Sequence, residues 1–302
     1  MTRTTPEWLY RPGDLADGPW ETAVDDRVDG WQHTGIRVAE LGDGSSADLE
    51  AGDVERIIVP LRGSFDVAYV SGEDGGAREQ RLAGRPSVFA GPSDVLFLGA
   101  GSSATISGSG RVAVAEAPTA ERRPARYMPA AEVPVEVRGG GKCTRQINNF
   151  GMPATLPEAA RLLVCEVITP ADNWSSYPPH KHDHDVPGRE AILEEIYYFE
   201  AEASKNQAEH DPAAAFGTFH TYASEGNDIS IDAIVKSGDV ALVPHGYHGP
   251  AAAAPGYDLY YLNVMNGPGA VREWLAVDDP DHAWVRDEVN AQEPDPRLPL
   301  TR

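Results

Sequence analysis

The chain has 302 residues, 41% of them hydrophobic, so it is long for one domain and comfortable for two. Its formal net charge of -22 at pH 7 argues against binding to nucleic acid or to an anionic membrane surface, because both attract lysine and arginine. The 30 glycines and 25 prolines punctuate short runs of Val, Ile, Tyr and Phe, which predicts an all-β protein.

The beginning of the chain gives no sign of export. Residues 1–7 lack the apolar run of a secretion signal, and no later segment approaches about eighteen uninterrupted apolar residues. Cys143 and Cys165 are the only cysteines, and a chain of this size needs no disulfide to fold. We therefore expect a cytoplasmic protein with reduced thiols.

The first part of the chain is typical of short strands separated by glycine-rich turns. No histidine occurs between His33 and His180, so this part offers few ligands to a transition metal. We expect residues 1–125 to form a domain that is structural or serves as a dimerisation surface. Residues 118–141, with their prolines and glycines, would connect it to a second domain at 126–302. The predicted strands of the first part are at residues 57–59, 65–70, 95–98 and 112–115.

The second part carries longer β-rich runs, bounded by Pro, Gly, Asn or Asp. A short helix is expected at residues 157–163 or within 268–275, and neither segment carries candidate ligands. The predicted strands of the second part are at residues 162–168, 195–199, 217–222, 229–235, 240–243 and 259–265.

Two histidines in the second part are spaced for one face of a strand. Successive side chains of a strand point to opposite faces, so His180 and His182 project together. A glutamate that opens the apolar run at 195–199 and a histidine that follows the Pro-x-Gly turn at 244–246 can reach the same interior. Three imidazoles and a carboxylate suit zinc, iron, manganese, nickel or cobalt, with a position left for substrate. His184 is a rival ligand if the strand continues that far.

The order HxH, Glu, Gly-x5-Pro-x-Gly and His resembles the two signature motifs of the cupin superfamily. The strings SSYPPHKHD, LEEIYYF, GDVALVPHGYH, GYDLYYLNVMNGP and DPDHAWV are similar to those of the 5-deoxy-glucuronate isomerases of inositol catabolism. The resemblance extends from about Trp31 to Trp284 and is dense after Gly141; residues 55–63 and 94–98 look like worn copies of parts of the two motifs. It implies two tandem cupin (jelly-roll) barrels, of which only the second binds metal.

The resemblance also implies which residues hold the metal. In cupins the carboxylate ligand directly precedes the apolar run, which favours Glu195 over Glu194, and the PxGYH pattern favours the last histidine over His245. Zinc or manganese is the favoured divalent ion, and iron, nickel and cobalt are also compatible. The implied ligand set is His180, His182, Glu195 and His248.

The reaction implied by the resemblance is an aldose to ketose isomerisation, which would convert 5-deoxy-glucuronate to 2-deoxy-5-keto-gluconate through an enediolate. A divalent metal chelated by the carbonyl and hydroxyl oxygens would stabilise the developing negative charge. Arg145 is the expected anchor for the substrate carboxylate, with Tyr260 as a further substrate contact; an inter-domain salt bridge is the alternative role of Arg145. The candidates for the catalytic base are Glu194, His245 and Tyr261, with Tyr260 and Asp172 as alternatives.

Three positions depart from the family pattern. Relatives usually carry a Gln-Arg pair where this chain has Phe219 and His220, and Arg or Lys where it has His245. A related uronate isomerase is therefore an alternative, as is a cupin dioxygenase with iron in a similar ligand set. A non-catalytic sugar-binding protein would have an incomplete ligand set. As partners we expect a small acidic sugar and further copies of the chain in a homo-oligomer.

Overall fold

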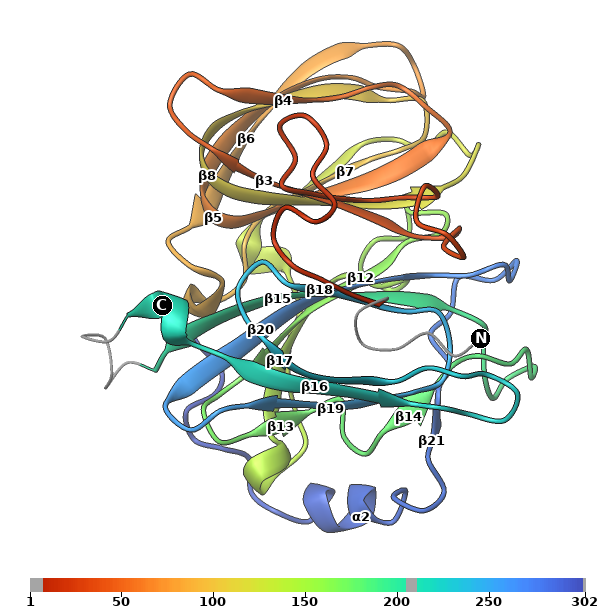
Figure 1. Ribbon diagram of the computed structural model, residues 1–302. Coiled ribbons are helices and arrows are strands. Elements are labelled where there is room, and N and C mark those ends of the chain that lie inside the picture. The colour runs from red at the N-terminus through yellow and green to blue at the C-terminus, as the bar shows by residue number, and fades with distance from the viewer. Residues whose placement is uncertain (1–7, 205–210, 301–302) are drawn as a thin grey trace.

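The computed structural model describes residues 8–204 and 211–300, and it consists mainly of β-strands (Figure 1). The predicted all-β class is confirmed. Residues 1–7, in which no secretion signal is expected, lie outside the described part. Among the described residues, no helix has the length and apolar character needed to span a membrane.

The N-terminal half is built on two long antiparallel strands, β5 (Val54–Val70) and β8 (Ser103–Pro118). They pair along their whole length, with one irregularity between Pro60 and Arg62. A bulge of this kind bends a pair of strands, so β5 and β8 contribute to both layers of this half (Figure 1). The other strands of this half are β2 (Thr22–Val24), β3 (Gly35–Leu41), β4 (Ser46–Leu49), β6 (Ala77–Arg85), β7 (Val95–Leu98) and β9 (Arg126–Met128).

The C-terminal half consists of two sheets that face each other (Figure 1). A seven-stranded sheet has the order β1-β18-β15-β20-β12-β11-β10 and lies between the N-terminal half and a six-stranded sheet. Its strands are β1 (Leu9–Tyr10), β10 (Val135–Arg138), β11 (Arg145–Gly151), β12 (Leu163–Thr169), β15 (Glu194–Ala203), β18 (Val240–Val243) and β20 (Tyr257–Asn266). The six-stranded sheet contains β13 (Trp174–Ser175), β14 (His180–Lys181), β16 (Gly217–Tyr222), β17 (Ile231–Val235), β19 (Tyr247–Ala253) and β21 (Val277–Asp278).

The two halves share one hydrophobic core. Ile57 and Phe97 of the first half belong to the same buried cluster as Tyr198 and Leu262 of the second. The strands β12 and β18 are buried along their whole length, as expected for a middle layer that is covered on both faces.

Two short strands show how the chain passes between the halves. The first strand, β1, pairs with β18 of the second half, whereas β9 pairs with β7 of the first. The chain therefore crosses from one half to the other between β9 and β10, just beyond the boundary predicted at residue 125.

The predicted strands at 95–98, 217–222 and 240–243 begin and end at the predicted residues. The predicted helices are wrong, because neither 157–163 nor 268–275 is helical. In the first segment the backbone N–H groups of residues 160–162 donate to Glu55 instead of forming a helix. The α-helix of the C-terminal region is α2 (Val285–Asn290).

Candidate metal centre and active site

The four predicted ligands come from neighbouring segments of the C-terminal half. His180 lies on β14 and pairs directly with His248 on β19. Glu195 lies on β15, in the facing sheet, and His182 follows β14 by one residue. The period of two along an extended strand sends Lys181 away from this group, as the sequence predicts.

His180, Glu195 and His248 converge on one point, and His182 joins them through its contact with Glu195, with its ring centroid 6.3 Å from that of His180. The Oε2 atom of Glu195 lies 2.9 Å from Nε2 of His182 and 3.1 Å from Nε2 of His248. The ligand atoms of His180, Glu195 and His248 lie within 4.8 Å of one another. The ring centroids of His180 and His248 are 4.4 Å apart, and those of His182 and His248 are 4.7 Å apart. We call these four residues the His/Glu cluster.

The hydrogen bonds of the cluster fit a bound cation. Nδ1 of His182 donates to the carbonyl of Leu193 at 3.0 Å, and Nδ1 of His248 donates to the carbonyl of Gly246 at 3.1 Å. A neutral imidazole that donates from Nδ1 has a lone pair on Nε2, so in their neutral form both histidines would turn acceptors toward the Glu195 carboxylate. Nε2 of His248 is buried and has no hydrogen-bond partner in the described residues. A divalent cation would satisfy these converging acceptors.

The protonation states in the cluster agree with this reading. Burial, reinforced by neighbouring His248, lowers the pKa of His180 and so favours the neutral imidazole that can bind a metal. Burial alone would raise the pKa of Glu195, but its contacts with His182 and His248 outweigh burial and lower it. Burial alone would lower the pKa of His182, and the contact with Glu195 raises it. A divalent cation would take the place of the proton that His182 and Glu195 otherwise share.

Two predicted site residues point to the opposite face of the same sheet. Glu194 precedes the ligand Glu195 on β15, and its carboxylate accepts the backbone N–H groups of residues 32–34. Tyr260 precedes Tyr261 on β20, and its hydroxyl donates to Glu166 at 2.8 Å. Neighbouring strand residues face opposite ways, so the structure does not place Glu194 as a base or Tyr260 as a substrate contact.

Two further histidines lie outside the cluster. His245 is half-buried, and its Nε2 atom contacts the carbonyl of Asp228 at 3.1 Å. A cavity lies beside the His/Glu cluster, and His245 is not among the residues that line it. The structure therefore does not place His245 as a base. His184 is 45% exposed and contacts Asp183 at 2.6 Å, so the rival ligand does not join the cluster.

A cavity of about 290 Å³ opens beside the cluster, near the lower end of the range for small-molecule sites. His180 and Glu195 form part of its wall, and so do three arginines, Arg138, Arg145 and Arg286. A chain with a net charge of -22 thus concentrates positive charge at this cavity. The arrangement suits a small anion that also contacts the metal centre.

Arg145 is the arginine of this group without a carboxylate partner. Arg138 pairs with Glu136 at 2.8 Å, and Arg286 pairs with Asp278. Arg145 is 8% exposed, and within the described residues it forms no ion pair; its Nη1 atom donates to the carbonyl of Cys143 at 3.2 Å. Burial lowers the pKa of Arg145, and the positive charges of Arg138 and Arg286 add to this effect. A buried guanidinium of this kind is ready to bind an anion.

Hydroxyl groups line another part of the cavity wall. The Oγ atom of Ser176 lies 3.0 Å from the hydroxyl of Tyr261 and 3.3 Å from that of Tyr197. Burial raises the pKa of Tyr261 to about 12, and it also raises the pKa of Tyr197. Both tyrosines are therefore protonated near neutral pH and can donate hydrogen bonds to a substrate oxygen.

The C-terminal region provides a part of the cavity wall that the sequence does not indicate. Trp274, Asp278 and Arg286 line the cavity, and Asp278 is the register partner of His180. Among the residues that line the cavity, Asp278 and Glu195 are the carboxylates. The DPDHAWV string lies between Asp278 and Arg286, but nothing in its spacing indicated that its neighbours reach the site.

Phe219 and His220, two of the three residues that depart from the family pattern, have different surroundings. Phe219 is fully buried, and its ring lies 4.6 Å from that of Tyr197 and 5.5 Å from that of Phe199. His220 points the other way and contacts Asp232 at 2.9 Å. Phe219 thus supports the aromatic packing behind Tyr197.

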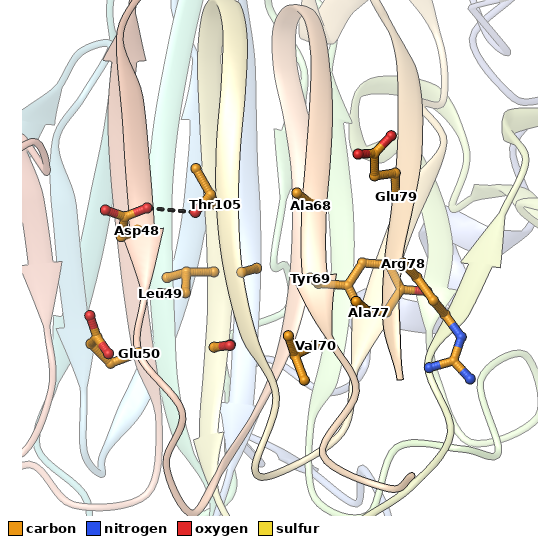
Figure 2. Close-up of a pocket in the computed structure, with 12 residues that line it drawn as sticks. Asp48, Leu49, Glu50, Ala68, Tyr69, Val70, Ala77, Arg78, Glu79 and Thr105 are labelled. Atoms are coloured by element: carbon orange, nitrogen blue, oxygen red, sulfur yellow. Dashed lines mark hydrogen bonds between the residues drawn. The ribbon is translucent and has the colours of Figure 1, made fainter. Parts of the chain in front are cut away.

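A larger hollow of about 810 Å³ lies on the N-terminal half, over β4, β5, β6 and β8 (Figure 2). Its lining includes Asp48, which accepts a hydrogen bond from Thr105 at 2.7 Å, and the exposed side chain of Val70. No imidazole or thiol is among the lining residues. The smaller cavity beside the His/Glu cluster is therefore the candidate for the chemistry.

The chain is similar to known proteins of one family. The model of the KduI/IolB family matches residues 8–285. A 5-deoxy-glucuronate isomerase of Geobacillus kaustophilus is 41% identical over 262 residues, which are 85% of this chain and 87% of the relative. A 5-deoxy-glucuronate isomerase of Bacillus subtilis strain 168 is 35% identical over 255 residues, which are 83% of this chain and 86% of the relative.

Solved structures show the same architecture. An IolB-like protein of Salmonella typhimurium LT2 superposes with a TM-score of 0.80 at 32% identity, over 92% of this chain and 98% of the other. An oxalate decarboxylase of Bacillus subtilis superposes with a TM-score of 0.63 at 12% identity, over 98% of this chain and 89% of the other. At so low an identity the second likeness shows a shared fold alone.

Proposed function

The chain belongs to the KduI/IolB family, and we propose that it is a metal-dependent isomerase that converts 5-deoxy-glucuronate to 2-deoxy-5-keto-gluconate in myo-inositol catabolism. Relatives up to 41% identical carry the name 5-deoxy-glucuronate isomerase. The observation that carries the proposal is a single cavity lined by both an unpaired buried guanidinium, Arg145, and two members of the His/Glu cluster. An acidic sugar has a carboxylate that can bind the guanidinium, and a carbonyl with its neighbouring hydroxyl that can bind at the His/Glu cluster.

The first step is binding of the sugar acid. The carboxylate of the substrate accepts hydrogen bonds from Arg145, which has no competing acid in the described residues. This contact fixes the orientation of the sugar, so that its aldehyde and the neighbouring hydroxyl face the His/Glu cluster. Tyr197 and Tyr261, held protonated by burial, donate to the sugar oxygens.

The cluster His180, His182, Glu195 and His248 would hold a divalent ion, with zinc or manganese favoured and iron, nickel and cobalt compatible. Such an ion supplies Lewis-acid stabilisation of the negative charge that develops on the sugar oxygens. Because His182 and His248 are fixed by backbone carbonyls, their Nε2 atoms need little rearrangement to act as ligands.

Isomerisation also requires a base that moves a proton between adjacent carbon atoms. Tyr261 is held protonated by burial, so we assign it the role of a donor. Asp278 is the lining carboxylate that does not belong to the His/Glu cluster, and Arg286 holds it through Nε at 2.6 Å. In the proposed reaction Asp278 accepts the proton from the carbon that bears the hydroxyl and returns it to the former aldehyde carbon.

We also propose a cellular compartment and an oligomeric state for the enzyme. We place the enzyme in the cytoplasm, as a homo-oligomer that acts on a small acidic sugar. The two cysteines support this location, since both are free and Cys165 is fully buried.

The test is an anaerobic assay of the metal-loaded protein with 5-deoxy-glucuronate in D2O. We expect the ketose product, with deuterium introduced at the former aldehyde carbon to the extent that the proton on the base exchanges with solvent. Treatment with a chelator or the substitution His248→Ala should abolish both turnover and metal binding. Turnover that requires oxygen would favour the dioxygenase alternative. Sugar binding without turnover by the metal-loaded protein would favour the non-catalytic alternative.

A further inference from the structure

A buried carboxylate that does not line the cavity adjoins the His/Glu cluster. It belongs to Asp183, which directly follows the ligand His182, and its side chain is 1% exposed. We propose that Asp183 is a positioning residue that fixes His182 and His248 relative to each other and thereby sets the metal affinity of the cluster. The proposal rests on the metal centre proposed above and is independent of the identity of the sugar.

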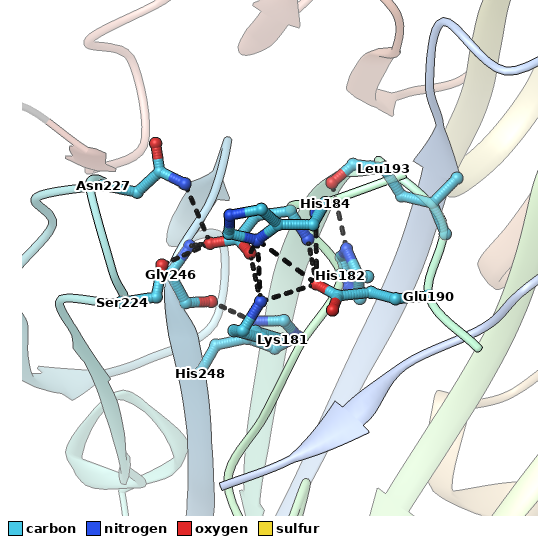
Figure 3. Close-up of polar contacts among 10 residues, drawn as sticks. Lys181, His182, His184, Glu190, Leu193, Ser224, Asn227, Gly246 and His248 are labelled. Atoms are coloured by element: carbon cyan, nitrogen blue, oxygen red, sulfur yellow. Dashed lines mark hydrogen bonds and ion pairs between the residues drawn. The ribbon is translucent and has the colours of Figure 1, made fainter. Parts of the chain in front are cut away.

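Both oxygens of the Asp183 carboxylate accept hydrogen bonds from donors in separate segments of the chain. Oδ1 accepts from Lys181 Nζ at 2.6 Å. Oδ2 accepts from the hydroxyl of Ser224, from Nδ2 of Asn227 at 3.1 Å and from the backbone N–H of Gly246 at 3.0 Å. One buried side chain thus ties the HxH segment to the loop before β17 and to the turn before β19 (Figure 3). Burial alone would raise the pKa of Asp183, but these donors outweigh burial and lower it.

The contact with Gly246 reaches the ligand His248 directly. The N–H of Gly246 donates to Asp183, and its carbonyl accepts from Nδ1 of His248 at 3.1 Å. Gly246 has a φ of 86°, and a Cβ atom there would lie 2.4 Å from the side chain of Ile229, so the turn requires glycine. A shift of Asp183 would therefore shift both Gly246 and the orientation of the His248 ring.

Lys181 and Glu190 complete the same network. Oε1 of Glu190 accepts from Lys181 Nζ at 2.7 Å and from the backbone N–H groups of Asp183 and His184 at 2.9 and 3.1 Å. Asp183, His184 and Glu190 have side chains of the kinds that bind metal ions, and they lie close together. The Lys181 ammonium, however, lies between them. The network therefore serves to hold the backbone around His182 in place and does not form a second metal site.

The test is the substitution Asp183→Asn in the full-length protein. The amide keeps the size of the side chain, but it loses the negative charge and turns a donor toward either Lys181 or Gly246. We expect the affinity for Zn²⁺, measured by competition with a chromophoric chelator, to fall about 10- to 100-fold, as for other residues that orient metal ligands. The visible spectrum of the Co²⁺-substituted protein should change as well, because its bands report coordination geometry. The matched control is Asp232→Asn, an exposed carboxylate on β17, which should leave both readouts unchanged.

Two further variants keep the proposal testable if Asp183→Asn fails to fold. Ser224→Ala and Asn227→Ala each remove one donor to Asp183, and each should lower Zn²⁺ affinity about two- to tenfold, the effect of one hydrogen bond. A double variant Lys181→Met/Asp183→Asn should lose less affinity than the sum of its single variants, because both single variants break the same contact between Lys181 and Asp183.

The outcomes separate this proposal from the proposed function. Unchanged Zn²⁺ affinity and an identical Co²⁺ spectrum in Asp183→Asn, or unchanged affinity in both alanine variants, would overturn the role of Asp183. A wild-type protein that binds metal and responds to Asp183→Asn, yet does not isomerise the sugar, would overturn the proposed reaction while the role of Asp183 stands.

Discussion

Glu55 and Glu194 make reciprocal contacts between the two halves of the chain. Glu55, near the start of β5, accepts the backbone N–H groups of residues 160–162, each at 2.7 Å. Glu194, at the start of β15, accepts those of residues 32–34 at 2.6 to 3.2 Å. Each half thus binds a backbone segment of the other with an equivalent carboxylate, which indicates that the halves are related as an internal repeat.

This relationship explains why the first half has no metal ligand at the corresponding position. The residue after Glu55 is Arg56, whereas the residue after Glu194 is the proposed ligand Glu195. Arg56 is buried and pairs with Glu116 at 2.8 Å. The first half therefore fills the position with an internal ion pair, in agreement with the absence of histidine between His33 and His180.

The same substitution at the two adjacent glutamates of β15 should lower the stability of the protein at one position and remove the metal at the other. Glu194→Gln should lower the free energy of unfolding by about 1.5–3 kcal/mol, because an amide replaces a buried acceptor of three N–H groups, while metal binding persists. Glu195→Gln should remove the metal. Urea unfolding and elemental analysis of both variants measure the two effects, with Glu55→Gln as the matched control for stability. Loss of metal in a folded Glu194→Gln protein would contradict the assignment.

Metal removal should lower the melting temperature of the wild type. A ligand that binds only the native state stabilises it by mass action, by about 4 kcal/mol at a free concentration of 1,000 times Kd. Scanning calorimetry with and without a chelator measures the shift. His248→Ala should show no such shift, since one of the four converging side chains is missing. An equal shift in both proteins would place the metal elsewhere.

Substitution of Arg145 should weaken substrate binding. Arg145→Met removes the guanidinium that has no carboxylate partner in the described residues, and we expect KM to rise about 10- to 100-fold, the equivalent of one charge-assisted contact. The effect should disappear with a substrate analogue that has an alcohol in place of the carboxylate. Arg81→Met, which removes an exposed arginine paired with Asp66, is the control. A KM unchanged by Arg145→Met would refute the carboxylate contact.

Substitution of Asp278 should act on the proton transfer and not on the metal. Asp278→Asn should lower kcat about 10²- to 10⁴-fold, the usual contribution of general base catalysis. Zn²⁺ affinity should stay within a factor of two or so of the wild type, because Asp278 is outside the His/Glu cluster. Asp281→Asn, on the same segment, is the control. Wild-type turnover by Asp278→Asn would assign the base to another group.

The ion pair between Asp295 and Arg297 should make the stability of the protein depend on pH in the acidic range. Hydrogen bonds from Arg297 lower the pKa of Asp295 from 3.8 to about 2. A carboxyl group with a lowered pKa in the folded state stabilises the protein above its unfolded pKa and loses this contribution as the pH falls toward its folded pKa. The difference in melting temperature between wild type and Asp295→Asn should therefore shrink between about pH 4 and pH 2. A difference that is constant over this range would contradict the pairing with Arg297.

Local signals predicted part of the His/Glu cluster, whereas the choice of Glu195 and of His248 came from the resemblance to the cupin motifs. The alternation of His180 and His182 along a strand and the glycine-containing turn before His248 do not depend on distant residues. The same alternation, once β15 was placed, decides between Glu194 and Glu195. The choice could not be made from the residues alone, because both faces of the following run are apolar and buried.

The remaining parts of the site depend on tertiary contacts. Asp278 and Arg286 reach the cavity because β21 pairs with β14, about one hundred residues earlier in the chain, and no local pattern indicates that pairing. Tyr260 and His245 were expected at the site from their neighbours in sequence. Tyr260 instead contacts Glu166 between the halves, and His245 contacts a loop carbonyl.

The strand β1 has a consequence for any attempt to divide this protein. Leu9 and Tyr10 pair with Ala241 and Val240 of β18, so the beginning of the chain completes the sheet that carries Glu195. A fragment that starts after the crossover would leave the edge of β18 open to pairing with other molecules. On the ribosome, β1 is synthesised long before its partner β18 exists. The sheet of the second half is thus completed by a strand that precedes the first half in the chain.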